Sequence, residues 1–305
     1  MKRNFLLGLA ILAITVPCIS CSAGVVALPT REMQTVGDGV SLHLRIAGDP
    51  ASGEVLIALH GGPGMNRAYM LNLEQLANQE LAVVTYDQRG SGLSTSPAAE
   101  PANYTLAKHV ADLEVVRKTL GVEQVHFLGH SWGGILALQY ALVHPQRVQS
   151  LILVNSGPPT WEGIMEAQAS LGARIQALQQ AGVLQTGQPQ SAGEALKMVL
   201  PAYFSDPSFW FSSENEKEPV SFSQTANSLT MVAIEGYDIT SELARLDHRV
   251  LILRGEDDPF GRPMIEATRS ALKNARVEMV ELERCGHFWH ECPDEFFARV
   301  RAFLD

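Results

Sequence analysis

A serine lies in a segment whose spacing suits nucleophilic catalysis. Residues 129–134 read GHSWGG, which matches the pattern G-x-S-x-G around Ser131. The apolar run 125–128 precedes this segment and a helical pattern over 135–142 follows it, which places the serine on a strand-to-helix turn. Such a turn strains the backbone at the serine, and the flanking glycines avoid clashes with its neighbours. The alternative is a purely structural role, in which the segment is a glycine-rich turn capped by a serine. We predict that Ser131 is a nucleophile whose hydroxyl projects above a sheet, at the positive end of a helix.

A serine nucleophile needs a base, and the base needs an acid that orients it. The apolar run 250–253 is followed by two carboxylates, Asp257 and Asp258, and the apolar run 277–282 is followed by His287. The order serine, acid, histidine along the chain is the order expected when the serine lies on such an elbow. These residues predict a catalytic triad.

A glycine-rich segment after the apolar run 55–59 could stabilise the charge that develops on an attacked carbonyl. Residues 60–64 read HGGPG, and small residues let a backbone N–H approach the carbonyl oxygen. We predict an oxyanion hole made by the backbone N–H groups of Gly62 and of Trp132, the residue after the serine. His60 is expected to be structural.

Residues 285–292 read CGHFWHEC, in which two cysteines bracket two histidines. This segment could be a zinc site, a disulfide loop or the setting of a catalytic histidine. A zinc site would need all four side chains to converge within one short segment, whereas closed zinc sites usually draw on two separated ligand pairs. A disulfide needs the two Cα atoms to come within about 7 Å. The spacing leaves the three possibilities open, with zinc the least favoured.

The N-terminal segment 1–21 has the form of an export signal. Lys2 and Arg3 precede an apolar run over 5–16, which is shorter than the roughly 20 residues of a membrane-spanning helix. Cys21 would carry the lipid if this were a lipoprotein signal, but ordinary cleavage and release is favoured. We therefore expect an exported protein, periplasmic or extracellular, with no transmembrane span after cleavage.

Export also changes the chemistry expected of the cysteines. If Cys18 and Cys21 leave with the signal or carry lipid, Cys285 and Cys292 remain in an oxidising compartment. We predict that these two cysteines form a disulfide.

The rest of the chain alternates apolar runs with helical patterns, which predicts an α/β fold on a mostly parallel sheet with helices on both faces. Residues 40–46 alternate apolar and polar side chains, as a half-buried strand does. Runs typical of strands buried on both faces lie at 55–59, 81–85, 125–128, 151–154 and 250–253. Because ligands of parallel sheets bind at the carboxyl ends of the strands, the segments after these runs should meet at one edge.

The composition is that of a globular protein. The chain has 305 residues, of which 46% are hydrophobic and 18% charged, enough for one large domain with an insertion or two small domains. The net charge is −10 and no basic run occurs, which argues against nucleic acid or an anionic membrane surface as a partner. A small molecule or a short peptide is the expected partner.

Together these motifs resemble those of the α/β-hydrolase fold, and within it the proline iminopeptidase (prolyl aminopeptidase) family. The resemblance covers about residues 35–305 and rests on HGGPG at 60–64, DQRGSG at 87–92, GHSWGG at 129–134 and GH at 286–287. The segment GEDD at 255–258 matches the family's G-x-x-D, which selects Asp258 as the triad acid. The motifs are less specific for the substrate, because esterases, lactonases and carbon–carbon-bond hydrolases share this core.

The resemblance implies a serine hydrolase that forms an acyl-enzyme and needs no metal or other cofactor. It makes His287 the general base and leaves the cysteines as bystanders or as a disulfide clamp on the loop. The leading interpretation is an exported enzyme that releases N-terminal proline or another small apolar residue from peptides. The alternative is an esterase or lactonase acting on small acyl substrates. A third possibility is a binding protein that keeps the fold but has lost catalytic activity. The intact triad residues argue against it.

The resemblance also implies a helical cap at about 157–240, inserted in a hydrolase domain that spans 22–305. Family members recognise the free amine of the substrate with acidic side chains near the cap. In some members one of these follows the triad acid directly, but here that position is Pro259. The candidates to replace it are Glu214, Glu216, Glu218 and Glu235, although a charge run such as 214–218 is usually a solvated surface. Glu235 is the first to test, with an exposed glutamate at a helix end as the alternative.

Overall fold

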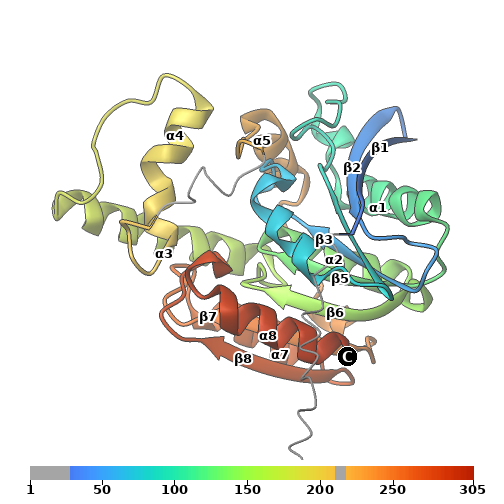
Figure 1. Ribbon diagram of the computed structural model, residues 1–305. Coiled ribbons are helices and arrows are strands. Elements are labelled where there is room, and N and C mark those ends of the chain that lie inside the picture. The colour runs from blue at the N-terminus through green and yellow to red at the C-terminus, as the bar shows by residue number, and fades with distance from the viewer. Residues whose placement is uncertain (1–27, 210–217) are drawn as a thin grey trace, which may run out of the picture.

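Eight strands form one sheet in the computed structural model, which describes residues 28–209 and 218–305 (Figure 1). The strand order is β1-β2-β4-β3-β5-β6-β7-β8. The strands are β1 (Thr30–Gly37), β2 (Val40–Ala47), β3 (Glu54–Leu59), β4 (Leu81–Tyr86), β5 (Val125–His130), β6 (Val148–Val154), β7 (Arg249–Gly255) and β8 (Arg276–Leu282). From β4 to β8 all neighbouring strands pair in parallel, whereas β1 and β2 are antiparallel. This confirms the predicted α/β fold with a mostly parallel sheet.

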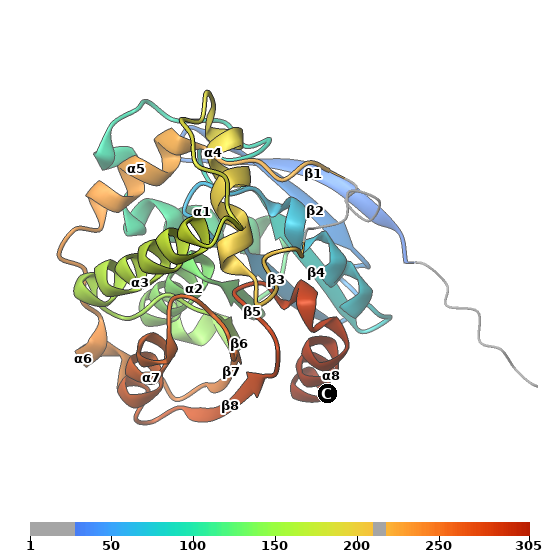
Figure 2. The same ribbon diagram turned by 90° about the vertical axis from the view of Figure 1, so that its left-hand side faces the viewer.

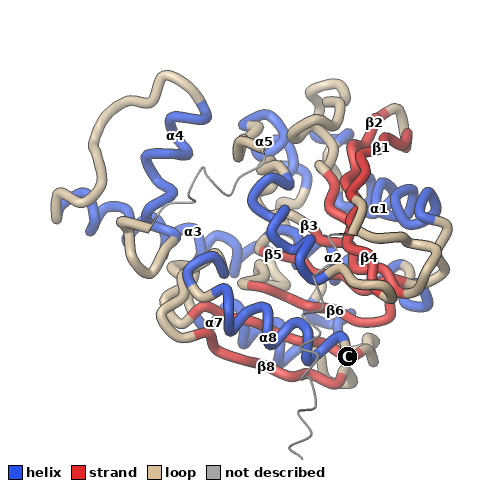
Figure 3. Tube along the Cα trace, in the orientation of Figure 1, coloured by secondary structure: helices blue, strands red, loops and turns tan. Residues whose placement is uncertain are grey.

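Helices cover both faces of the sheet, as the tube in Figure 3 makes clear. They are η1 (Arg67–Leu76), η2 (Pro101–Asn103), α1 (Leu106–Leu120), α2 (Trp132–Val143), η3 (Pro145–Arg147), α3 (Trp161–Gln180), α4 (Ala192–Val199), η4 (Leu200–Tyr203), α5 (Gln224–Ala233), α6 (Thr240–Leu243), α7 (Arg262–Ala271), η5 (Trp289–Glu291) and α8 (Pro293–Leu304). One core packs the sheet against α1, α2 and α7, and the other packs it against η1 and α8. Val55 and Ile57 of β3 belong to the first core, whereas Leu56 and Ala58 belong to the second. The continuous apolar runs are thus strands buried on both faces, as predicted.

The first strand was not expected from the sequence. β1 is a mostly exposed edge strand with a polar sequence, TREMQTVG, which carries no continuous apolar run. Its partner β2 alternates buried and half-buried residues, which agrees with the half-buried strand predicted at 40–46. An edge strand with little buried area gives a weak sequence signal, because its pairing with β2 supplies its stability.

The helices α3 to α6 lie between β6 and β7, and α3 to α5 fall within residues 157–240, the segment predicted as the cap and called the cap below. In Figure 2, α3 and α4 lie in front of the sheet, on the side that faces the viewer. The N-terminal segment 1–21 and the cap residues 210–217 lie outside the described residues. Within the described part of the chain, no helix combines the length and the apolar character that crossing a membrane requires.

Candidate active site

Ser131 occupies the turn between the end of β5 and the start of α2. Its backbone has φ 55° and ψ −119°, a left-handed φ that is rare for a residue other than glycine. The glycines beside it are there because the chain leaves no room for a Cβ. One at Gly133 would clash with the carbonyl oxygen of Leu59 in β3, and one at Gly129 would clash with the backbone of Gly133. The local structure is therefore the strained elbow that the motif predicts, with the serine at its tip.

His287 and Asp258 meet beside this elbow, and both are almost completely buried. The Nδ1–H of His287 donates to Oδ1 of Asp258 at 3.1 Å. A proton held on Nδ1 leaves Nε2 free to accept one, which is the tautomer that a general base needs. His287 and Ser131 line the same cavity. Asp257 is exposed and accepts instead from Oγ of Ser205 at 2.6 Å, so the carboxylate in contact with the histidine is that of Asp258.

The two residues predicted to form the oxyanion hole flank the serine. Gly62 and Trp132 line the cavity that Ser131 also lines. Within the described residues, the backbone N–H groups of Gly62 and Trp132 make no hydrogen bond to another protein group. Unused donors on the wall of the nucleophile's cavity are what the stabilisation of an oxyanion requires.

A chain of hydrogen bonds ties the oxyanion loop to the histidine loop. The backbone N–H of Gly61 donates to the Tyr69 hydroxyl at 2.6 Å, and that hydroxyl lies 2.8 Å from Nδ1 of His130. Nε2–H of His130 then donates to the carbonyl oxygen of His287 at 2.9 Å. Burial, and next the nearby His287, lower the pKa of His130 well below its usual value. A neutral imidazole can accept at one nitrogen and donate at the other, as this chain needs.

Asn155 joins the ends of two strands, β6 and β7, to the same loop. It follows β6 with a left-handed φ of 43°, and its Oδ1 accepts from the backbone N–H of Gly255 at 2.8 Å. Its amide N–H groups donate to the carbonyl oxygens of Gly286 at 3.2 Å and His287 at 2.8 Å. Asn155 was not predicted from the sequence. Its signal there is a polar residue directly after the buried strand 151–154, the same position that the predicted site residues take after the other strands.

Glu291 joins the histidine loop to the cap. Its Oε2 accepts from the backbone N–H groups of Gly286 at 2.8 Å and Ser205 at 2.9 Å, and its Oε1 accepts from Asp206 at 2.9 Å. In addition, the backbone N–H of His287 donates to the carbonyl oxygen of Tyr203 at 2.7 Å. Hydrogen bonds to the carboxylate of Glu291 and to the carbonyl oxygen of Tyr203 thus hold the loop of the base against the cap.

The segment 285–292 is a disulfide-closed loop around the base. Cys285 and Cys292 are bonded, with their Cα atoms 5.7 Å apart, as predicted. His290 does not point toward them in a ligand set, because its Nε2 lies 2.9 Å from the carbonyl oxygen of Tyr69, and burial lowers its pKa to about 4. No group of three or more His, Cys, Asp or Glu side chains in the described ranges is arranged to hold a metal ion.

His60 is structural, as predicted. Its Nε2 accepts from the backbone N–H of Gln88 at 3.0 Å, and its carbonyl oxygen accepts from the Gln88 side chain at 2.8 Å. The Oε1 of Gln88 in turn accepts from the indole N–H of Trp132 at 2.8 Å. One glutamine therefore connects the two segments that carry the oxyanion donors.

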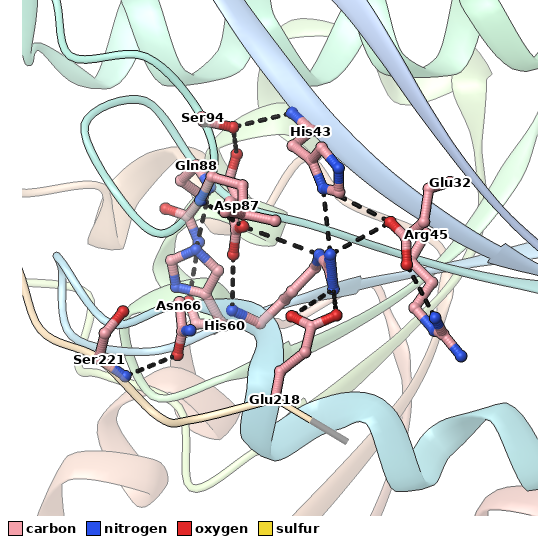
Figure 4. Close-up of polar contacts among 12 residues, drawn as sticks. Glu32, His43, Arg45, His60, Asn66, Asp87, Gln88, Ser94, Glu218 and Ser221 are labelled. Carbon is pink, nitrogen blue, oxygen red and sulfur yellow. Dashed lines mark hydrogen bonds and ion pairs between the residues drawn. The ribbon is translucent and has the colours of Figure 1, made fainter. Parts of the chain in front are cut away.

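A buried arginine, Arg67, pairs with Glu218, which Figure 4 labels, and so connects the core to the returning chain of the cap. Arg67 is 1% exposed, and its Nη1 lies 3.0 Å from both carboxylate oxygens of Glu218. Its backbone N–H donates to Asp87 at 2.8 Å. Beside it, Asn66 bonds the backbone of Pro219 and Ser221 at 3.0 Å each. Glu218 is therefore engaged in an ion pair away from the serine.

Glu235, the candidate for recognising a substrate amine, lies elsewhere. It is exposed just after α5 and is not among the residues that line either cavity at Ser131. The structure thus brings Ser131, His287, Asp258 and the oxyanion donors together but does not bring Glu235 to them.

Comparison with known proteins shows what the chain is similar to. Residues 54–291 match the family described as "alpha/beta hydrolase fold". The chain is 31% identical over 263 residues to the proline iminopeptidase of Lactobacillus delbrueckii subsp. lactis, which covers 80% of this chain and 87% of the relative. It is 29% identical over 280 residues to the putative carbamate hydrolase RutD of Caulobacter vibrioides, covering 89% and 98%.

Among solved structures, the chain is similar to a proline iminopeptidase-related protein of Thermus thermophilus. The TM-score is 0.69 and the identity 26%, over 91% of this chain and 98% of that one. Relatives at comparable identity therefore carry different names, and identity alone does not select among their substrates.

Proposed function

The chain belongs to the alpha/beta hydrolase family, and on that premise we propose that it is a serine hydrolase working through an acyl-enzyme. Ser131 Oγ attacks the acyl carbon while Nε2 of His287 takes its proton. The developing oxyanion accepts from the N–H groups of Gly62 and Trp132. His287 then returns the proton to the leaving atom, and a water activated by the same nitrogen releases the acid. The Nδ1 contact between His287 and Asp258, at 3.1 Å, supports these roles.

We propose further that the substrate is a simple ester or lactone with an uncharged acyl group, rather than an aminoacyl compound with a free amine. The observation that carries this proposal is the lining of the cavities at Ser131, which includes no aspartate, glutamate, lysine or arginine among the described residues. An ammonium group placed there would lose its hydration without gaining a charged partner, which is costly. The relatives named proline iminopeptidase favour a second candidate, an aminopeptidase.

Replacing the ammonium of an aminoacyl ester by a methyl group of nearly the same size separates these two candidates. We expect kcat/KM for the nitrophenyl ester of propionate to equal or exceed that for the glycine ester, because no carboxylate among the described residues lines the cavities at Ser131. An aminopeptidase would lose at least about tenfold on this replacement, since a charge-assisted contact is worth roughly 1.5–3 kcal/mol. A tenfold preference for the free amine would contradict the proposal. Glu235→Gln serves as the control, and it should leave both rates unchanged because the side chain is exposed outside the cavities.

We also propose that the enzyme works outside the cytoplasm after loss of residues 1–21. The bond between Cys285 and Cys292 supports this, because disulfides persist in oxidising compartments and are rare in the cytosol.

Mass spectrometry of the protein from its native cell fractions tests this location. We expect the enzyme in the periplasm or medium to lack residues 1–21 and to yield a non-reduced peptide in which Cys285 and Cys292 are joined. The control is the same digest after reduction and alkylation, in which both cysteines should carry the label. Full-length protein in the cytosol with two free thiols would refute export.

A further inference from the structure

We propose that Ser131 opens into two chambers with separate tasks: a small one takes a short uncharged acyl group, and a large one takes a bulkier neutral leaving group. This inference rests on the proposed function and names the class of substrate within it. The acyl chamber is about 70 Å³, and the leaving-group chamber is about 410 Å³. Both are lined by Gly62, Ser131, Gln168 and Phe260, which mark the boundary between them.

The position of the base decides which fragment enters which chamber. His287 lines the large chamber and not the small one. Because the histidine must pass its proton to the leaving atom, the leaving group has to lie on the histidine's side of the serine. Trp132, an oxyanion donor, lines only the small chamber. The acyl tail therefore extends past Trp132, away from His287.

The walls of the small chamber define the acyl group. Away from the boundary, its side chains are the indole of Trp132 and otherwise aliphatic or thioether groups. The latter include Ile135, Ile164, Met231 and Met264. At about 70 Å³ it is roughly half the volume of an apolar cavity of about 150 Å³ that holds benzene. An acyl chain of a few carbon atoms fits this space, and a medium-length chain does not.

The large chamber accepts a different kind of fragment. Its wall carries the phenol of Tyr203 and the amides of Gln224 and Asn227 among apolar side chains such as Leu196 and Phe222. Apart from histidines, none of its described residues is ionisable near neutral pH. A neutral leaving group with some polar character, such as an aromatic or substituted alcohol, matches this lining.

One helix borders both chambers and offers a matched pair of positions. The residues of α3 that line them are Ile164, Ala167, Gln168, Leu171, Gly172 and Ile175. This spacing is one face of a helix. Ala167 lines only the acyl chamber, and Gly172 lines only the leaving-group chamber. A Cβ at Gly172 would meet nothing within 4 Å, so a larger side chain there has room to enter the chamber.

The test uses Ala167→Leu and Gly172→Leu with a grid of esters that combines acetyl, butyryl and hexanoyl groups with ethyl, phenyl and naphthyl alcohols. The wild-type enzyme should prefer acetyl or butyryl over hexanoyl esters by at least about tenfold in kcat/KM, the usual scale for an ill-fitting apolar group. In Ala167→Leu, kcat/KM for butyryl esters should fall relative to that for acetyl esters by a similar factor, whichever alcohol the ester carries. In Gly172→Leu, kcat/KM for naphthyl esters should fall relative to that for ethyl esters, whichever acyl group the ester carries. Ile164→Ala should recover the hexanoyl esters, which keeps the acyl arm testable if Ala167→Leu is unstable.

Two outcomes would overturn the assignment. In one, the change in kcat/KM depends on the same part of the ester, acyl group or alcohol, in both leucine variants. In the other, kcat/KM of Ala167→Leu depends on the alcohol and that of Gly172→Leu depends on the acyl group. Failure of the proposed function looks different. The wild-type enzyme would then form no adduct with a fluorophosphonate and hydrolyse none of the esters, or it would show the tenfold preference for a free amine that is described above.

Discussion

Replacing Ser131 with alanine is expected to lower kcat by roughly 10⁴- to 10⁶-fold, as removal of a triad nucleophile does in other serine hydrolases. Without Oγ no acyl-enzyme can form. The oxyanion donors and the binding chambers remain in place, so a small residual rate over the uncatalysed reaction should persist. Initial rates with a saturating short-chain ester give the loss in kcat directly. A fluorophosphonate should label Ser131 in the wild-type enzyme and give no adduct at position 131 in the variant.

A buried serine near the elbow, Ser156, provides the control. Ser156 is 0% exposed, and its hydroxyl donates to the carbonyl oxygen of Gly157, but it lines neither chamber. Ser156→Ala should lose about 1 kcal/mol of stability, the usual worth of one hydrogen bond, while its kcat stays within about tenfold of the wild type. If Ser131→Ala kept nearly the full rate in pure protein, the nucleophile would have to be another residue.

Replacing Asp258 with asparagine is expected to lower kcat by about 10⁴-fold, the scale measured for the equivalent change in another triad. The amide keeps the volume of the side chain but removes the charge that stabilises the imidazolium. It can also present an N–H to His287 and so favour the tautomer that cannot accept the serine proton. KM should change little, because Asp258 lines neither chamber.

The neighbouring carboxylate is a control one residue away. Asp257 is exposed and bonds Oγ of Ser205, so Asp257→Asn should leave kcat within a few-fold of the wild type. Circular dichroism of both variants checks that the fold is retained. A severe loss in Asp257→Asn together with a mild one in Asp258→Asn would move the acid by one position.

Much of the fold could be predicted because a strand that is buried on both faces has a continuous apolar run in its own sequence. The runs at 55–59 and 125–128 are continuous and apolar because each strand faces a core on both sides of the sheet. The edge strand β1 escaped prediction because its residues face solvent and its position depends on pairing with β2. A polar segment of this kind looks the same in the sequence whether or not it joins a sheet.

The supports of the candidate site were not predictable in the same way. Tyr69 contacts His130, Asn155 contacts His287, and Glu291 contacts Ser205, in each case across many tens of residues of sequence. No periodicity or short motif reports such contacts. Glu235 is an example of a wrong inference from position in the sequence. It lies where the cap returns toward the strand that precedes Asp258, which suggested a place in the pocket, yet its side chain is exposed.

The sequence by itself determined the α/β fold and the residues proposed for the triad, Ser131, His287 and, through the matching motif, Asp258. These depend on local physics: the burial of each strand, the steric demands of glycine in a tight turn, and the tendency of parallel strands to end at one edge. The tertiary structure alone decided what surrounds the serine. The chamber walls combine α3, α5 and the loops after β3, β6 and β7, so their charge and volume emerge only when distant segments pack together.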